Sequence, residues 1–85
     1  MNKELQLVRD LAGAHPNTLE AIEACIKCMD TPIAVEDASG EVMVVNDGYR
    51  SLENIDSMEP ESIEIGEWVV SAFTKRKRPH LYLVR

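Results

Sequence analysis

Two cysteines three positions apart are the first pair of residues in this chain that could do chemistry. Cys25 and Cys28 fall in a segment with helical periodicity, where i and i+3 positions share a face, so their thiols would supply half of a four-ligand metal site. No second pair completes such a site, and His15 and His80 do not stand at ligand spacing. A thioredoxin-like role would place the motif at a helix start after a strand, whereas here the motif falls late in the predicted helix. We expect buried small apolar side chains here, with a metal or disulfide bridging two subunits as the alternative.

A run of four basic residues, 75–78, is the second candidate. Such a run can contact phosphate, but the net charge of −6 argues against whole-domain attraction to nucleic acid or to an anionic membrane. As a connector between strands it would be a solvated turn that discourages edge-to-edge pairing. The alternative is contact with the acidic segment 59–67 of a partner subunit. We therefore expect DNA contact only through another domain or partner.

The remaining polar residues do not form a catalytic constellation. His80 has the side chain that titrates near neutral pH, but next to Pro79 at a strand edge we expect it to be exposed and idle. Asp37 and Asp47 stand in a turn and at a helix start, which suits turn and capping roles rather than an acid–base pair. No nucleophile with an adjacent base and no glycine-rich phosphate loop is present. The sequence predicts neither an enzyme, nor a metal site, nor a cofactor.

Composition limits the class of protein. The chain has 85 residues, of which 45% are apolar and 28% charged, as expected for one small folded domain. No apolar run approaches the ~20 residues of a membrane span, and the first eleven residues lack a signal-peptide core. Two cysteines are too few to form the disulfide framework of a small secreted protein. A cytoplasmic location without a membrane partner is the expectation.

The first thirty residues predict two helices. Residues 2–11 are amphipathic, and Gly13 is the expected stop. Asn17 with Glu20 has capping-box spacing and starts a second helix that ends before Pro32. The apolar face of this second helix comprises Leu19, Ile22, Ile26 and Met29. We treat residues 1–30 as an N-terminal helical extension of a core formed by residues 31–85.

The rest of the chain predicts mainly strands. Residues 32–36 and 42–45 form a hairpin around a turn at 37–40. The segment 46–48 then ends the strand and offers side-chain oxygens to cap a short helix over 47–54. Residues 62–74 are strand-like, with Gly66 as a bulge or as a break between two strands. Residues 80–85 alternate as a last strand. The predicted fold is α+β, with an antiparallel sheet of about five strands, N-terminal helices and one short helix after the second strand.

Two groups of residues carry a resemblance to the PAS domain family. The first group resembles the opening hairpin and helix of that fold and comprises Pro32, Ile33, Val35, Asp37, Gly40, Asn46, Tyr49 and Leu52. The second is similar to its final hairpin and comprises Trp68, Val70, Ser71 and Phe73. Across residues 20–85 the chain is most similar to the small N-terminal PAS domains of transfer activators from conjugative plasmids, which pair this module with a C-terminal helix-turn-helix.

The resemblance implies a PAS-like sheet in which the first strand lies beside the last, so that Val35 and Leu83 would be neighbours. The segment 55–61 has room for one or two turns where most PAS domains place several helices, including a cofactor-binding helix, so we expect no cofactor. Because the sequence stops at or near the last strand, we also expect it to be one module of a longer protein.

The resemblance also implies a function, namely a regulatory module for dimerisation and protein–protein interaction in a bacterial transcriptional regulator or signalling protein. We expect a homodimer with an interface at Leu5, Val8, Leu11 and Ile22. The alternative is that Leu5, Val8 and Leu11 only cover the domain's own sheet. One alternative is a small-molecule sensor with a pocket lined by Tyr49, Trp68 and Phe73. Another is a stand-alone small protein that binds and modulates a heterologous regulatory partner.

Overall fold

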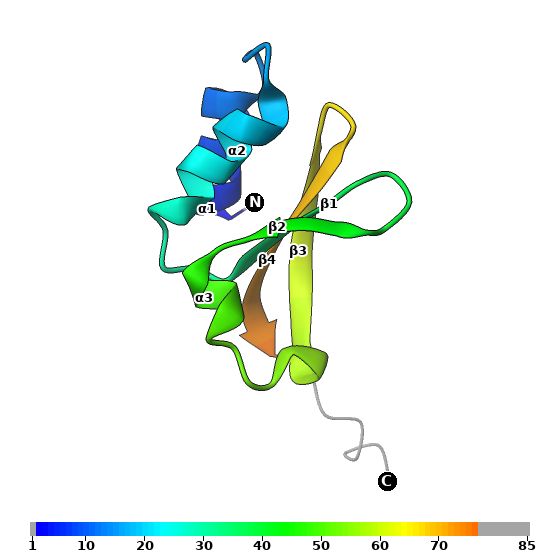
Figure 1. Cartoon of the computed structure of the whole chain (residues 1–85). Coiled ribbons are helices and arrows are strands. Elements are labelled where there is room, and N and C mark those ends of the chain that lie inside the picture. Colours follow the sequence, from blue (N-terminus) through cyan, green and yellow to red (C-terminus); the bar gives the residue numbers. More distant parts are fainter. Residues whose placement is uncertain (1, 77–85) are drawn as a thin grey trace, which may run out of the picture.

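A computed structural model describes the backbone of residues 2–76 and the side chains of residues 2–74. Two helices come first, followed by a sheet interrupted by short helical turns (Figure 1). The elements are α1 (Lys3–Ala12), α2 (Thr18–Lys27), β1 (Ile33–Glu36), β2 (Val42–Val45), α3 (Asp47–Arg50), the 3-10 turn η1 (Ile55–Ser57), β3 (Met58–Ile65) and β4 (Trp68–Arg76). The predicted α+β class is confirmed.

The strands form an antiparallel sheet in the order β2-β1-β4-β3. The described residues contribute four strands instead of about five, and the strand expected at 80–85 lies outside them. Val35 in β1 is opposite Val44 on one side and Val70 on the other. Both edges of β1 are therefore occupied by β2 and β4, and Leu83, the neighbour expected for Val35, lies outside the described residues.

Gly66 separates two strands. It has a φ of 63° and, with Glu67, makes the two-residue connection between Ile65 and Trp68, which are paired across the hairpin. Of the two sequence interpretations, the break is correct and the bulge is not. β4 then continues to Arg76, with Lys75 opposite Glu59, so the first half of the expected basic connector is strand.

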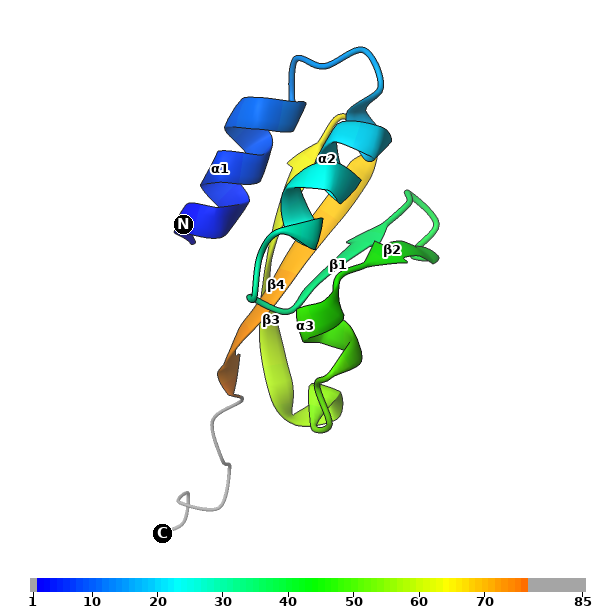
Figure 2. The same ribbon diagram turned by 60° about the vertical axis from the view of Figure 1, so that its left-hand side comes forward.

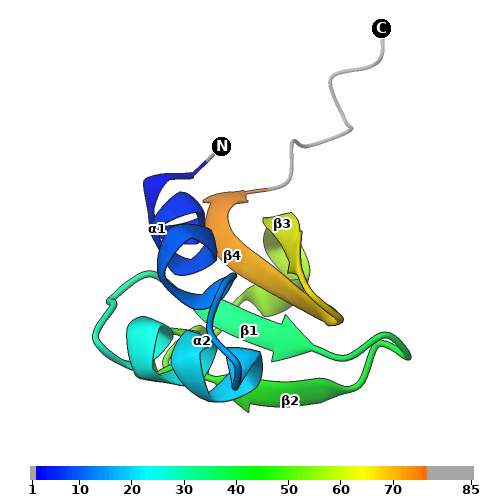
Figure 3. The same cartoon turned by 90° about the horizontal axis from the view of Figure 1, so that it is seen from above.

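Both long helices cover the same face of the sheet (Figure 2). Seen from above, α1 lies over the β3–β4 side and α2 over the β1–β2 side (Figure 3). Strand side chains alternate between faces, so one set of β residues meets the helices. The resulting core comprises Leu5, Val8, Ala12, Ile22, Ile26, Ile33, Val35, Ile63, Ile65, Val70 and Ala72. Helices and sheet thus share a single core.

This core corrects the expected dimer interface. Leu5, Val8 and Ile22 are 0% exposed, because they pack against the protein's own sheet. The fourth residue, Leu11, is 59% exposed. The interpretation that α1 covers its own sheet therefore holds for Leu5 and Val8, and Ile22 of α2 is buried in the same core.

The long helices begin and end near the predicted positions, but the predicted capping hydrogen bonds do not all form. α2 begins after Asn17 as predicted, but the Asn17 side chain makes no capping hydrogen bond, so the capping box does not form. The side chain of Asn2, by contrast, does cap α1. Its Oδ1 accepts hydrogen bonds from the backbone N–H groups of Glu4 and Leu5. α1 ends at Gly13, as expected.

Candidate functional site

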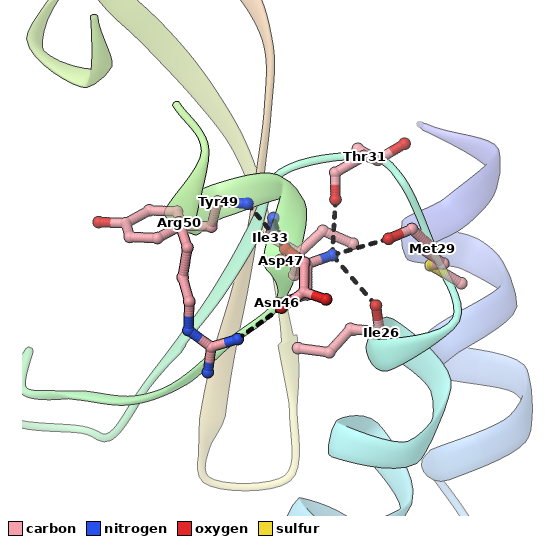
Figure 4. Close-up of polar contacts among 8 residues, drawn as sticks. All are labelled: Ile26, Met29, Thr31, Ile33, Asn46, Asp47, Tyr49 and Arg50. Atoms are coloured by element: carbon pink, nitrogen blue, oxygen red, sulfur yellow. Dashed lines mark hydrogen bonds and ion pairs between the residues drawn. The ribbon is translucent and has the colours of Figure 1, made fainter. Parts of the chain in front are cut away.

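A buried asparagine joins the helical layer to the start of the sheet. Asn46 is 2% exposed, and its Oδ1 accepts hydrogen bonds from the backbone N–H groups of Ile33 and Tyr49, each at 3.0 Å (Figure 4). The bond from Tyr49 is the helix cap that the sequence predicted. The bond from Ile33 ties the same oxygen to β1.

The amide nitrogen of Asn46 serves the opposite side of this junction. Its two hydrogens are shared among the carbonyl oxygens of Ile26, Met29 and Thr31, at 3.1, 3.3 and 2.7 Å. These carbonyls belong to the end of α2 and to the segment leading into β1. One side chain therefore satisfies backbone groups of α2, β1 and α3.

Gly48 allows α3 to approach this junction closely. A Cβ atom at this position would collide with the carbonyl oxygen of Asp30 and lie 3.1 Å from the backbone nitrogen of Pro32. The space is therefore filled by backbone, and only glycine fits without a shift. Together with Asn46, it holds α3 against the 30–32 segment.

The predicted pocket residues divide into two places. Tyr49 of α3 and Phe73 of β4 form an edge-to-face pair with ring centroids 5.5 Å apart. Trp68 stands five positions earlier on β4, which is about 16 Å along an extended strand. These three aromatic side chains therefore do not enclose one pocket, which corrects the expectation for a sensor.

Trp68 instead borders an open groove at the opposite end of β4, beside the start of α2. The groove has a volume of about 790 Å³ and is lined by Pro16, Asn17, Thr18, Leu19, Glu20, Glu23, Glu67 and Trp68. Trp68 is half-buried, whereas all three glutamates are exposed. Among the side chains that the structure describes, the only ion pair joins Asp47 to Arg50, so these glutamates have no cationic partner there.

The outward side of α1 carries two exposed leucines. Leu7 is 47% and Leu11 59% exposed, and their i,i+4 spacing places one above the other on the helix. The buried side of α1 is formed by Leu5, Val8 and Ala12. The sequence did not reveal that Leu7 is exposed. Leucines at 5, 7 and 11 leave open which side of the helix is buried, and Ala12 is too small to mark the buried side clearly.

The two cysteines differ in environment. Cys25 is half-buried, and its pKa is raised by burial and, secondarily, by the neighbouring Cys28. Cys28 lies at the end of α2 and is exposed, so the expectation of two buried thiols is wrong for this residue. Within residues 2–74, no group of three or more His, Cys, Asp or Glu side chains could hold a metal ion. A raised pKa disfavours the reactive thiolate form of Cys25.

The other singled-out residues show no joint site. His15 is exposed, and its Nδ1 accepts from the backbone N–H of Asn17. Asp37 holds the β1–β2 turn, as predicted, while His80 and residues 77–78 lie outside the described part of the chain. None of the helices in the described region has the length and apolar character to cross a bilayer.

Comparisons of this chain with protein-family models, with curated proteins and with solved structures found no match.

Proposed function

We propose that this chain is a PAS-like regulatory module that acts through dimerisation and protein–protein interaction, in a bacterial transcriptional regulator or signalling protein. The order of the sheet supports the PAS-like interpretation, since β1 lies between β2 and the last described strand, β4. The short helix capped by Asn46 directly after β2 agrees with it. The observation that carries the dimerisation step is the pair of exposed leucines on α1.

Leu7 and Leu11 form the proposed contact with a second copy of the chain. A two-fold axis beside α1 would pack the same pair from each copy together, as a self-complementary interface requires. Each half-exposed leucine would contribute on the order of 1 kcal/mol on burial. Four such side chains sum to about 4 kcal/mol, which corresponds to a dissociation constant of about 1 mM before the entropy of association is subtracted, so the expected dimer is weak.

This arrangement gives a route from the interface to the rest of the fold. α1 presents Leu7 and Leu11 outward and Leu5 and Val8 to the sheet, so a change in how α1 pairs would be transmitted directly to β3 and β4. An attached or bound output domain would be repositioned in this way. No catalytic step is part of the proposal.

The test is the mass of the full chain by light scattering, in reductant and at several concentrations. We expect a concentration-dependent dimer that is lost in the double variant Leu7→Asp/Leu11→Asp. The matched control is Val42→Asp/Met43→Asp, because these β2 residues are exposed to a similar degree, 47% and 44%, away from α1. Circular dichroism checks that both variants fold.

A monomer at every concentration, or a dimer that survives the α1 variant, would overturn the dimerisation step. A monomeric chain would favour the stand-alone modulator of a heterologous partner instead. The small-molecule sensor has less support, because Trp68 lies far from Tyr49 and Phe73 along β4.

A further inference from the structure

Three hollows meet around the tip of the β3–β4 hairpin, and Trp68 and Glu67 line all of them. The largest is the groove beside the start of α2, described above. A second, of about 350 Å³, includes Glu64 and Val69, and a third, of about 390 Å³, includes Asp37 and Ser39 of the β1–β2 turn. The hairpin tip, the start of α2 and the β1–β2 turn lie at the same end of the molecule (Figure 1).

The ionisable side chains lining these hollows are all acidic. Glu20, Glu23 and Glu67 border the first, Glu64 the second and Asp37 the third, and no lysine, arginine or histidine lines any of them. The half-buried indole of Trp68 is the aromatic surface they share. An aromatic face beside several carboxylates is a favourable environment for a cation, above all for the planar guanidinium of arginine.

Lys75 and Arg76, the described part of the chain's own basic run, lie at the far end of β4 from this site. β4 extends over nine residues from Trp68 to Arg76, so the backbone at its far end is about 26 Å from the hairpin tip. Among the described side chains, none that lines these three hollows is cationic, and Arg9 lines only a neighbouring hollow with Glu64 and Val69. The carboxylates around Trp68 therefore favour a cationic partner and would repel the phosphates of nucleic acid.

We propose that the hollows around Trp68 bind an extended, arginine- or lysine-rich segment of another protein. One cationic side chain lies on the indole, and its neighbours along the segment pair with Glu20, Glu23 and Glu67. An extended chain advances about 3.3 Å per residue, so a few residues span adjoining hollows that a single small amine would not. This surface is separate from the outward side of α1, and the inference does not depend on dimerisation.

The experiment uses intrinsic fluorescence, because Trp68 is the single tryptophan of the chain. The 85-residue chain is titrated with a hexapeptide of alternating arginine and glycine and, separately, with its glutamate–glycine counterpart. We expect a saturable change in Trp68 emission with the basic peptide only, weakened by added salt. The Leu7→Asp/Leu11→Asp variant should bind the basic peptide as the parent does, which separates this test from that of the dimer.

Two charge variants decide whether the site or the net charge attracts the peptide. Glu23→Gln/Glu67→Gln should weaken binding about tenfold, whereas Glu53→Gln/Glu59→Gln, which removes the same charge elsewhere, should change it less than about twofold. A Trp68→Phe variant, followed by backbone amide shifts in NMR spectra, should retain the fold and bind more weakly.

Three results would overturn the proposal: no saturable change, equal weakening by both charge variants, or equal binding of the acidic peptide. A saturable change of Trp68 emission on concentrating the protein alone, lost when residues 75–78 are replaced by glutamine, would also overturn it, because the occupant would then be a second copy of this chain.

Discussion

Asn46 and Ile33 exchange two hydrogen bonds, one through the backbone and one through a side chain. The Asn46 N–H donates to the carbonyl oxygen of Ile33 at 3.2 Å, and the Ile33 N–H donates back to Oδ1 of Asn46 at 3.0 Å. The side chain thus continues the β1–β2 ladder for one more pair while it also caps α3. Asn46, predicted only as a helix cap, therefore also joins the sheet to the helices through its hydrogen bonds.

Replacing Asn46 should destabilise the protein far more than the loss of a helix cap. Asn46→Ala removes the side-chain donor to the carbonyls of Ile26, Met29 and Thr31, and we expect a loss of about 3 kcal/mol in the free energy of unfolding. Asn46→Asp keeps the capping oxygen but places a carboxylate against the same carbonyls. Urea unfolding followed by circular dichroism measures both variants.

Asn46→Asp distinguishes the two roles of this residue. Because aspartate caps helices as well as asparagine does, a role limited to capping would leave this variant near the parent. Asn17→Asp, at an exposed N-cap whose side chain makes no hydrogen bond, is the control and should change stability by less than about 0.5 kcal/mol. A stable Asn46→Asp variant would contradict the proposed role of the amide nitrogen.

Gly48→Ala should destabilise the protein although it replaces a glycine within a helix. Alanine normally favours an exposed helix position by about 1 kcal/mol. Here its Cβ would collide with the carbonyl oxygen of Asp30, so we expect a net loss of about 1–3 kcal/mol in the free energy of unfolding. Ser51→Ala, exposed at the end of α3, is the control in the same urea titration. An unchanged or higher midpoint for Gly48→Ala would show that α3 does not lie this close to residues 30–32.

Asp37 should show a pKa below its ordinary value. The hydroxyl of Ser39 is the main cause, followed by the backbone N–H of Glu41, because both donate to the carboxylate. Since the folded pKa lies below the unfolded one, this stabilisation is present above the unfolded pKa and is lost as the pH falls through the folded value. Ser39→Ala should raise the pKa of Asp37 in an NMR titration of its carboxyl carbon, whereas Ser57→Ala should not. Equal values in all three proteins would refute the turn geometry.

Local patterns in the sequence predicted most of the elements. Residues 3–12 and 18–27 have helical periodicity, residues 33–36 and 42–45 flank a turn with Gly40 at a φ of 89°, and Asn46 precedes a helix. These signals succeed because they depend on neighbours along the chain. The first two residues of the basic run are strand and not connector, because pairing across a sheet decides how far a strand extends. Lys75 and Arg76 lie in β4 opposite Glu59 and Met58, fifteen or more positions away.

The sequence by itself determined the class of the fold, the helix starts and the turns, because these follow from backbone preferences and from hydrophobic periodicity within a few residues. Only the tertiary structure decided which face of α1 is buried, that Asn46 bonds α2 and β1 as well as α3, and that Trp68 lies apart from Tyr49 and Phe73. Each of these depends on packing between segments distant in the chain, where the buried phase of a helix and the partners of a side chain are set by what lies opposite.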